Sequence, residues 1–544
     1  MNTRQLQTDK NQKLYHALLG ILLVCALAMM MLLSYWACKY SYYGAVDGRT
    51  RGVLVGDKTW AHIAVFLAAS LCTMGIDKVL MKKDKSQQEK ICLCTLIVTS
   101  VIAFILGVFY VCKNPYYPVG DQINTTAFAA YCRDGNFSML SIGGYVGMYQ
   151  QQKGLAILYE ILFTLFGDFN YRPAKILHVV WWILTILAGY GFLKLNTDRP
   201  VFRMLYCVMM LGCFPLLFYL PYIYGDVLSI SFGIILFYGV AAYEHSGQKR
   251  YIALASFAAG LAVLARKNTW IVLVAVAVYV LLVSLRKKKV RYLMAGTAIL
   301  LTAALSVKAV DVIYEVRSGY PSGVGVPSIL WVAMGLQETE GRAGVYNRYQ
   351  QATFTDYDCQ QELAAQQGKE YIRERLEEFS QDPGMAFNFF KNKVEGQWIE
   401  PMYAALESTE SFEEGAELSP VLESLYYGEL GRTIWKLTNY YQSILYLAGL
   451  MALVMLGILW WKKKEVPISL WLPWIAVFGG FLFSILWEAK SRYVFPYCVF
   501  MILYAPEGLY QTGLLLCKLP KLRKFKKSGH TQDKGEEAPL RETA

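Results

Sequence analysis

Several ionisable residues of this chain stand where they could carry out acid–base or phosphate chemistry. Asp121, in the run Pro-Val-Gly-Asp-Gln, follows an apolar stretch, and its carboxylate could take a proton from a hydroxyl group. The alternative is a turn or a helix cap, because aspartate commonly opens helices. Lys153 stands just before the apolar segment Gly154–Phe166, where a cation could hold a phosphate. A lysine that extends from a helix end to the membrane surface is the simpler explanation.

Two further polar groups interrupt apolar sequence. Asp226 follows Tyr224 in Pro-Tyr-Ile-Tyr-Gly-Asp, and this mixture of aromatic and acidic side chains indicates a substrate-binding segment, although aspartate also suits a helix N-terminus. Arg266 and Lys267 occupy the polar tip of a predicted apolar hairpin, residues 252–285. They could hold an anion, or they could anchor the hairpin at the membrane surface.

Glu488 and Arg492 are four residues apart in the run Trp-Glu-Ala-Lys-Ser-Arg-Tyr. On a helix they would share one face and could pair with each other, whereas the planar fork of the arginine could instead hold phosphate oxygens. Glu338 belongs to a polar, glycine-rich stretch that either closes over a substrate or only links two elements. The twelve cysteines and five histidines lack metal-ligand spacing, so we expect no metal site and no cofactor.

The composition indicates which elements position these residues. Of 544 residues, 55% are hydrophobic and 17% are charged, against about 45–50% and about 25% in soluble domains. The net charge of +12 comes largely from lysine and arginine clusters at the ends of apolar stretches, which is typical of cytoplasmic loops and argues against nucleic-acid binding. Stretches long enough to cross a bilayer recur along the chain. The clearest are Ala17–Cys38, Ile91–Cys112, Val290–Val312, Tyr441–Trp461 and Val466–Trp487.

Counting crossings between the basic clusters predicts an all-α polytopic membrane protein with about twelve transmembrane helices. The same count places every polar segment described above on the side away from the cytoplasm. Gly154–Phe166 would span only about 20 Å, so we expect it to lie along the outer surface rather than to cross. Charge pairing at helical spacing in Gln360–Phe379 predicts a small helical subdomain outside the membrane.

The predicted organisation has five parts. We expect the last of them to be disordered, because it is rich in charge and poor in apolar residues. The parts are an N-terminal added pair of spans (1–90), a transmembrane core with a catalytic outer loop at 113–173 (91–313), an extracytoplasmic helical subdomain (314–440), C-terminal spans (441–517) and a basic cytoplasmic tail (518–544).

Taken in order, these segments resemble the GT-C superfamily of polyprenyl-phosphate-sugar-dependent glycosyltransferases. They are similar above all to the bacterial branch related to protein mannosyltransferases and lipid A aminoarabinose transferases. The resemblance covers roughly residues 91 to 513, and two features depart from it: Asp-Gln replaces two adjacent acidic residues, and Gly154 stands where proline is common. The matching motifs are Pro-Val-Gly-Asp-Gln, Lys153 before a segment that ends in Phe-Gly, Arg172-Pro173, Tyr224-Gly-Asp-Val-Leu, Leu264-Ala-Arg-Lys-Asn-Thr, and Glu488-Ala-Lys-Ser-Arg-Tyr with Pro496.

The resemblance implies a glycosyltransferase that moves a sugar from a polyprenyl-phosphate lipid donor to a glycan, lipid or protein acceptor, with inversion at the anomeric carbon. It implies a protein of the plasma membrane whose active site faces outside. Asp121 would be the catalytic base, and Lys153, Arg266 and Arg492 would bind the donor phosphate. The residues expected to bind the substrates are Tyr224, Asp226, Lys267, Glu338 and Glu488.

Two other functions remain open. A lipid-linked sugar flippase or another transporter would show repeated halves and charges at mid-bilayer, whereas this sequence has no internal repeat and its charges gather at one surface. A glycan ligase or polymerase that uses a lipid diphosphate donor would also carry cations in its outer loops, so the sequence does not separate it from the leading hypothesis.

Overall fold

The computed structural model describes residues 3–43, 53–323, 325–464 and 466–529, and 78% of it is helical. Within these ranges, nine helices are long and apolar enough to cross a membrane. The chain is therefore an all-α, multi-pass membrane protein, as predicted. The nine are α1 (Thr3–Lys39), α2 (Thr59–Leu80), α3 (Lys85–Lys113), α7 (Arg172–Asn196), α10 (Asp226–Ser246), α12 (Trp270–Lys287) with the 3₁₀ turn η3 (Lys267–Thr269), α13 (Val290–Ser318), α20 (Glu429–Trp461), and α21 (Leu472–Leu486) with η4 (Ile468–Trp471).

The number of long helices is smaller than the predicted number of about twelve transmembrane helices. Three of the predicted crossings are instead short or interrupted helices. One is divided into α8 (Pro200–Leu211) and α9 (Phe214–Phe218), and Pro215 stands in the first turn of the second piece. Another, α11 (Lys249–Ala265), has 17 residues. The last is divided into α22 (Ser491–Met501), which continues through Pro496, and α23 (Ala505–Gly529), which has Pro506 in its first turn. Proline removes a backbone donor and so favours such breaks.

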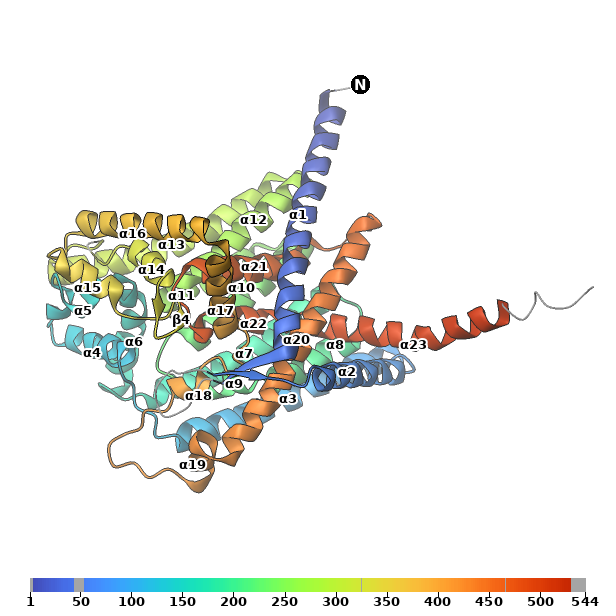
Figure 1. The fold of residues 1–544 in the computed structure, drawn as a ribbon, viewed down its shortest axis with the longest axis horizontal. Helices are drawn as coiled ribbons and strands as arrows, with labels where there is room; N and C mark the ends of the chain where they lie inside the picture. The colour runs from blue at the N-terminus through green and yellow to red at the C-terminus, as the bar shows by residue number, and fades with distance from the viewer. Residues whose placement is uncertain (1–2, 44–52, 324, 465, 530–544) are drawn as a thin grey trace, which may run out of the picture.

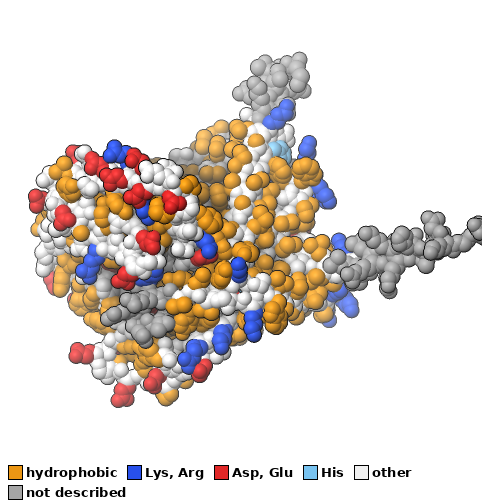
Figure 2. All heavy atoms as spheres, viewed as in Figure 1, with side chains coloured by type: hydrophobic (Ala, Val, Ile, Leu, Met, Phe, Trp, Pro, Cys, Tyr) orange, Lys and Arg blue, Asp and Glu red, His pale blue; other side chains and the backbone are white. Residues whose placement is uncertain are grey.

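Polar elements gather at one end of the molecule. Figure 1 shows α4, α5 and α6 beside α14, α15 and α16, whereas the C-terminal end of α23 lies on the opposite side. Charged side chains are dense on the lobe that carries these elements and sparse over the remaining, mostly hydrophobic body (Figure 2). The elements preceding α7 are α4 (Asp121–Arg133), η1 (Ser138–Leu140), α5 (Tyr145–Met148), η2 (Gln150–Gln152) and α6 (Lys153–Phe166).

The segment predicted as a helical subdomain is indeed mostly helical. Its longest helix, α16 (Gln361–Gln381), ends just before Pro383, as the sequence predicted. A minimal antiparallel hairpin, formed by β3 (Glu338–Thr339) and β4 (Arg342–Ala343), is the only sheet in this segment as described. The other helices are α14 (Ile329–Gly335), α15 (Tyr349–Asp356), α17 (Pro383–Trp398), α18 (Ala405–Ser408) and α19 (Pro420–Tyr427).

The N-terminal pair of helices packs into the body rather than beside it. Helix α1 lies along α20, and α2 lies along α23. Between them, β1 (Tyr40–Tyr43) and β2 (Val53–Gly56) form an antiparallel ribbon, with Tyr40 opposite Gly56. The ribbon is joined to the outer segment, because the Tyr42 backbone N–H donates to the carbonyl oxygen of Ile399 at 3.0 Å.

The first part of the basic tail is helical. Helix α23 continues through residue 518 to Gly529, where lysine, leucine and arginine, all good helix formers, predominate. Residues 518–529 are thus helical where disorder was expected, and residues 530–544 lie outside the described part of the chain.

Candidate functional site

One cavity of about 440 Å³, here called the first cavity, is lined by several distant parts of the chain, and four of them carry residues predicted from the sequence. They are the start of α4, the turn before α10, the tip between α11 and α12, and the segment from the end of α21 to the start of α22. Each of these parts was singled out from the sequence for its polar residues. The predicted residues that line this cavity are Asp121, Tyr224, Arg266, Lys267, Glu488 and Arg492.

Two glycines allow the α11–α12 tip to pack closely at this site. A Cβ atom on Gly154 would lie 2.6 Å from the carbonyl oxygen of Leu264, and one on Gly225 would overlap the backbone of Ala265. Only glycine permits such an approach. The departure at Gly154 from the proline of the resembled family therefore has a steric reason, which is the packing of α6 against the end of α11.

Asp121 lies both at the start of a helix and in the wall of the first cavity. It is the first residue of α4, where a carboxylate interacts favourably with the helix N-terminus. Its side chain is also exposed to the first cavity, and Tyr145 Oη donates to Asp121 Oδ1 at 2.8 Å. This hydrogen bond orients the carboxylate while leaving further lone pairs for a ligand.

Arg266 and Arg492 line the first cavity, whereas Asp226 is buried beside them and does not line it. Arg266 Nη1 donates to Asp226 Oδ2 at 2.9 Å, and Arg492 Nε lies 3.9 Å from Asp226 Oδ1. Both guanidinium groups also lie over the rings of Tyr224 and Tyr493. One carboxylate thus orients two arginines, and the group keeps a net positive charge that suits a phosphate. Asp226 is a positioning residue rather than a direct ligand in this geometry.

Glu488 is buried between α21 and α22, and Tyr493 Oη donates to its two oxygens at 3.4 Å each. Burial raises the pKa of Glu488 to about 7, Lys490 opposes this rise, and the nearby Asp121 carboxylate adds to it. Because α22 begins only after Glu488, the expected shared helical face with Arg492 does not form. No ion pair joins the two side chains among the described residues.

Two predicted residues lie away from the first cavity. Lys153 begins α6 and is buried, and its Nζ lies 2.5 Å from Asp311 Oδ1 and donates to Gln150 Oε1 and Ser322 Oγ. The structure thus gives this lysine a carboxylate partner in α13, away from the first cavity. Glu338, in β3, is exposed and lines neither this cavity nor its neighbour.

We predict that Lys153→Met lowers the free energy of unfolding by about 1.5–3 kcal/mol, the usual contribution of a hydrogen bond to a charged group. Binding of polyprenyl phosphate should not change. Thermal unfolding in detergent and lipid binding measure the two effects, and Asp311→Asn in the Lys153→Met background should recover part of the loss. If Lys153→Met is as stable as the wild type but binds polyprenyl phosphate more weakly, Lys153 is a phosphate-binding residue after all.

The first cavity also has an aromatic wall that sequence reasoning missed. Trp331 and Trp487 stack in parallel, with ring centroids 5.8 Å apart and planes within 5°, and Tyr149 packs on the edge of this stack. Flat aromatic faces provide apolar contact area beside the polar groups. Trp487 directly precedes Glu488 in the sequence, but its partner comes from another segment, and only tertiary packing brings the two rings together.

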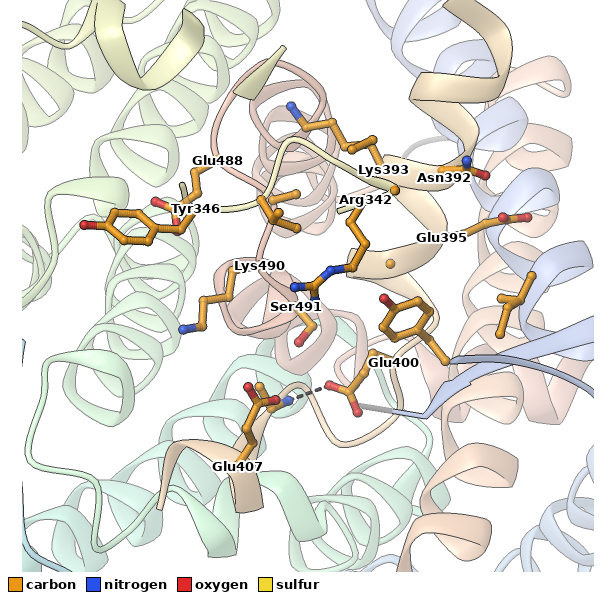
Figure 3. Close-up of a pocket in the computed structure, with 18 residues that line it drawn as sticks. Arg342, Tyr346, Asn392, Lys393, Glu395, Glu400, Glu407, Glu488, Lys490 and Ser491 are labelled. Atoms are coloured by element: carbon orange, nitrogen blue, oxygen red, sulfur yellow. Dashed lines mark hydrogen bonds between the residues drawn. The ribbon is translucent and has the colours of Figure 1, made fainter. Parts of the chain in front are cut away.

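A second cavity of about 410 Å³ adjoins the first and shares Tyr346, Glu488 and Lys490 with it (Figure 3). Burial lowers the pKa of Lys393 to about 7 and raises the pKa of Glu400 to about 7. The sequence contains no signal for these two residues, because charged side chains in a polar loop usually face solvent.

Similarity to known proteins offers no independent assignment of this site. Comparison of the chain with models of protein families, with curated proteins and with solved structures gives no match.

Proposed function

We propose that this protein is a membrane glycosyltransferase. It moves a sugar from a polyprenyl-phosphate-linked donor to a hydroxyl group of a glycan, lipid or protein acceptor on the extracytoplasmic side, with inversion at the anomeric carbon. The observation that carries the proposal is the lining of the first cavity, where oriented arginines face two carboxylates beside an aromatic wall.

The charge of the first cavity supports a lipid phosphate as ligand. Four cationic side chains line it against two carboxylates, Asp121 and Glu488. The Arg492 Nε–H has no hydrogen-bond partner among the described residues, whereas Arg266 donates a hydrogen bond to Asp226. An arginine fork with donors to spare suits the oxygens of a departing phosphate. The four cations are Arg266, Lys267, Lys490 and Arg492.

The transfer requires one proton acceptor and one stabilised leaving group. As the acceptor hydroxyl oxygen bonds to the anomeric carbon, its proton passes to the Asp121 carboxylate. The bond between the anomeric carbon and the phosphate oxygen breaks, and its electron pair leaves on polyprenyl phosphate, which Arg266 and Arg492 stabilise. A single displacement of this kind inverts the anomeric centre. Glu488, in the wall between the two cavities, holds the acceptor hydroxyl by accepting a hydrogen bond.

We also propose the twelve-crossing topology, in which α8 with α9, α11, and α22 with α23 complete the nine long helices. Basic residues at both ends of the chain and at 462–464 then face the cytoplasm, and the first cavity faces outside. The grouping of α4–α6 with α14–α16, away from the C-terminal end of α23, supports this sidedness (Figure 1). A polyprenyl lipid would reach such a site from the outer leaflet.

The function can be tested with the full-length protein in lipid nanodiscs and a panel of radiolabelled polyprenyl-phosphate sugars. We expect sugar to leave the lipid fraction and free polyprenyl phosphate to appear in equal amount, as measured by scintillation counting and mass spectrometry. Empty nanodiscs and matching diphosphate-linked donors are the controls. Turnover of only the diphosphate donors would assign the protein to the ligases or polymerases, and flipping without chemistry in proteoliposomes would make it a transporter.

A further inference from the structure

The proposed donor site leaves the second cavity without a ligand. Its volume of about 410 Å³ lies within the range of about 300–1,000 Å³ typical of small-ligand sites. It meets the first cavity at Tyr346, Glu488 and Lys490, so a ligand in one would face a ligand in the other across this wall. Figure 3 shows Glu488, Lys490 and Ser491 on one side of this space and residues of α17 on the other.

The lining of the second cavity is rich in hydrogen-bonding groups. Both oxygens of Glu400 are already engaged, because they accept from the backbone N–H groups of Met402 and Ala404. Glu395 differs: its side chain is buried, and Oε1 has no hydrogen-bond partner among the described residues, with only Lys391 Nζ at 3.8 Å. A buried carboxylate oxygen in this state has acceptor capacity that a ligand hydroxyl could use.

The charge balance separates the two cavities. The first has four cations against two carboxylates, whereas the second has four carboxylates against three cations. A phosphate is therefore favoured in the first cavity and disfavoured in the second. The carboxylates of the second are Glu395, Glu400, Glu407 and Glu488, and its cations are Arg342, Lys393 and Lys490.

We propose that the second cavity binds the acceptor, and that this acceptor is an uncharged carbohydrate whose hydroxyls donate to Glu395, Glu407 and Glu488. This inference rests on the proposed function and names the class of its second substrate. Carboxylate, amide and hydroxyl groups beside tyrosine rings are suited to a polyhydroxylated ligand, and Asn392, Ser491 and Tyr346 complete such a set here. An anionic glycan or a phosphorylated lipid would meet like charges.

The N-terminal pair of helices takes part in this site. Tyr42 and Leu54, from the ribbon between α1 and α2, line the second cavity together with β4 and the Glu488 segment. The ribbon is held there by the hydrogen bond from the Tyr42 backbone to Ile399, next to Glu400. The added helices therefore supply one wall of the acceptor site, which lies beyond the part of the chain covered by the family resemblance.

A glycine in the wall allows a sharp test. Gly396, in α17, lines the second cavity, and a Cβ atom there would meet nothing within 4 Å, so Gly396→Trp should fill the space without moving the backbone. Gly75→Trp is the matched control, because Gly75 lies exposed on α2 and also has open space at its Cβ. Glu395→Gln tests the role of the unpaired Oε1 oxygen, because the substitution removes the negative charge with almost no change in side-chain shape.

The measurement is binding of fluorescently labelled neutral trisaccharides and tetrasaccharides to the full-length protein in nanodiscs. We expect Gly396→Trp to weaken binding by about tenfold or more, because the indole occupies the ligand's space, and Glu395→Gln by about threefold to tenfold. Gly75→Trp should bind as the wild type does, and polyprenyl phosphate should bind all four proteins equally. No binding to the wild type, equal binding to Gly396→Trp, or stronger binding of acidic oligosaccharides would each overturn the inference.

Donor turnover separates this inference from the proposed function. Gly396→Trp should still release sugar from the polyprenyl-phosphate donor to water while losing transfer to the oligosaccharide. If the wild type binds the oligosaccharide but turns over no donor, the proposed function fails and the carbohydrate site stands. If donor turnover is normal and Gly396→Trp transfers sugar as the wild type does, the acceptor site alone is refuted.

Discussion

Asp121→Asn should lower kcat for sugar transfer by about 10²–10⁴-fold, the range by which a general base usually contributes. Asparagine is nearly isosteric, still suits the start of a helix, and can accept the hydrogen bond from Tyr145 Oη. The fold and the KM for the donor should therefore stay close to those of the wild type. Steady-state kinetics with the radiolabelled donor measure the loss, and thermal unfolding confirms that the variant is folded.

Glu488→Gln is the matched test, because Glu488 is the other carboxylate of the first cavity. We expect it to raise the KM for the acceptor and to remove a pH dependence centred near 7. The wild-type kcat/KM for the acceptor should rise as the pH increases through about 7, because burial raises the pKa of Glu488 to this value and the ionised form accepts the hydroxyl hydrogen bond. If Glu488→Gln lowers kcat strongly and Asp121→Asn lowers it only slightly, Glu488 rather than Asp121 is the catalytic base.

Glu488→Gln should also change how the stability of the protein depends on pH. The folded-state pKa of Glu488, about 7, exceeds its ordinary value of 4.5, so the folded protein binds the proton more tightly than the unfolded chain does. The contribution of Glu488 to the free energy of unfolding is fully present below pH 4.5 and is lost as the pH rises towards 7. Glu488→Gln should therefore raise Tm relative to the wild type above pH 7 and change it little at low pH.

Arg492→Lys should raise the KM for the polyprenyl-phosphate donor by about tenfold or more, because an ammonium keeps the charge but loses the planar fork. Arg492 is the better target of the two arginines, since its closest approach to Asp226 is 3.9 Å, whereas Arg266 makes a 2.9 Å hydrogen bond to the same carboxylate. Arg266→Lys should also reduce stability, because it disturbs that buried pair.

The control for these variants is Arg133→Lys. Arg133 is also an arginine of this polar end of the molecule, but it pairs with Asp168 and lines neither cavity. Its KM for the donor should remain that of the wild type. A similar rise in KM for Arg133→Lys and Arg492→Lys would mean that charge over the whole surface, rather than the cluster around Asp226, attracts the donor, and salt titration would then abolish both effects.

Local features of the sequence determined most of the elements. The apolar stretches predicted the long helices, because crossing a bilayer requires a length of apolar residues that can be counted directly. Polar residues at 266–268 predicted the tip between α11 and α12, and the polar loops before α4 and α22 predicted where Asp121 and Glu488 lie. Each of these inferences depends on neighbours within a few residues.

Tertiary structure decided which of these residues work together. Asp311, in α13, pairs with Lys153 away from the first cavity, and Asp226 is buried beside the two arginines instead of lining that cavity. The second cavity is lined jointly by the ribbon between α1 and α2, by α17 and by the Glu488 segment, which lie far apart in the sequence. The physical reason is that periodicity and composition specify which face of an element is apolar, whereas ion pairs and cavities depend on which distant elements pack against that face.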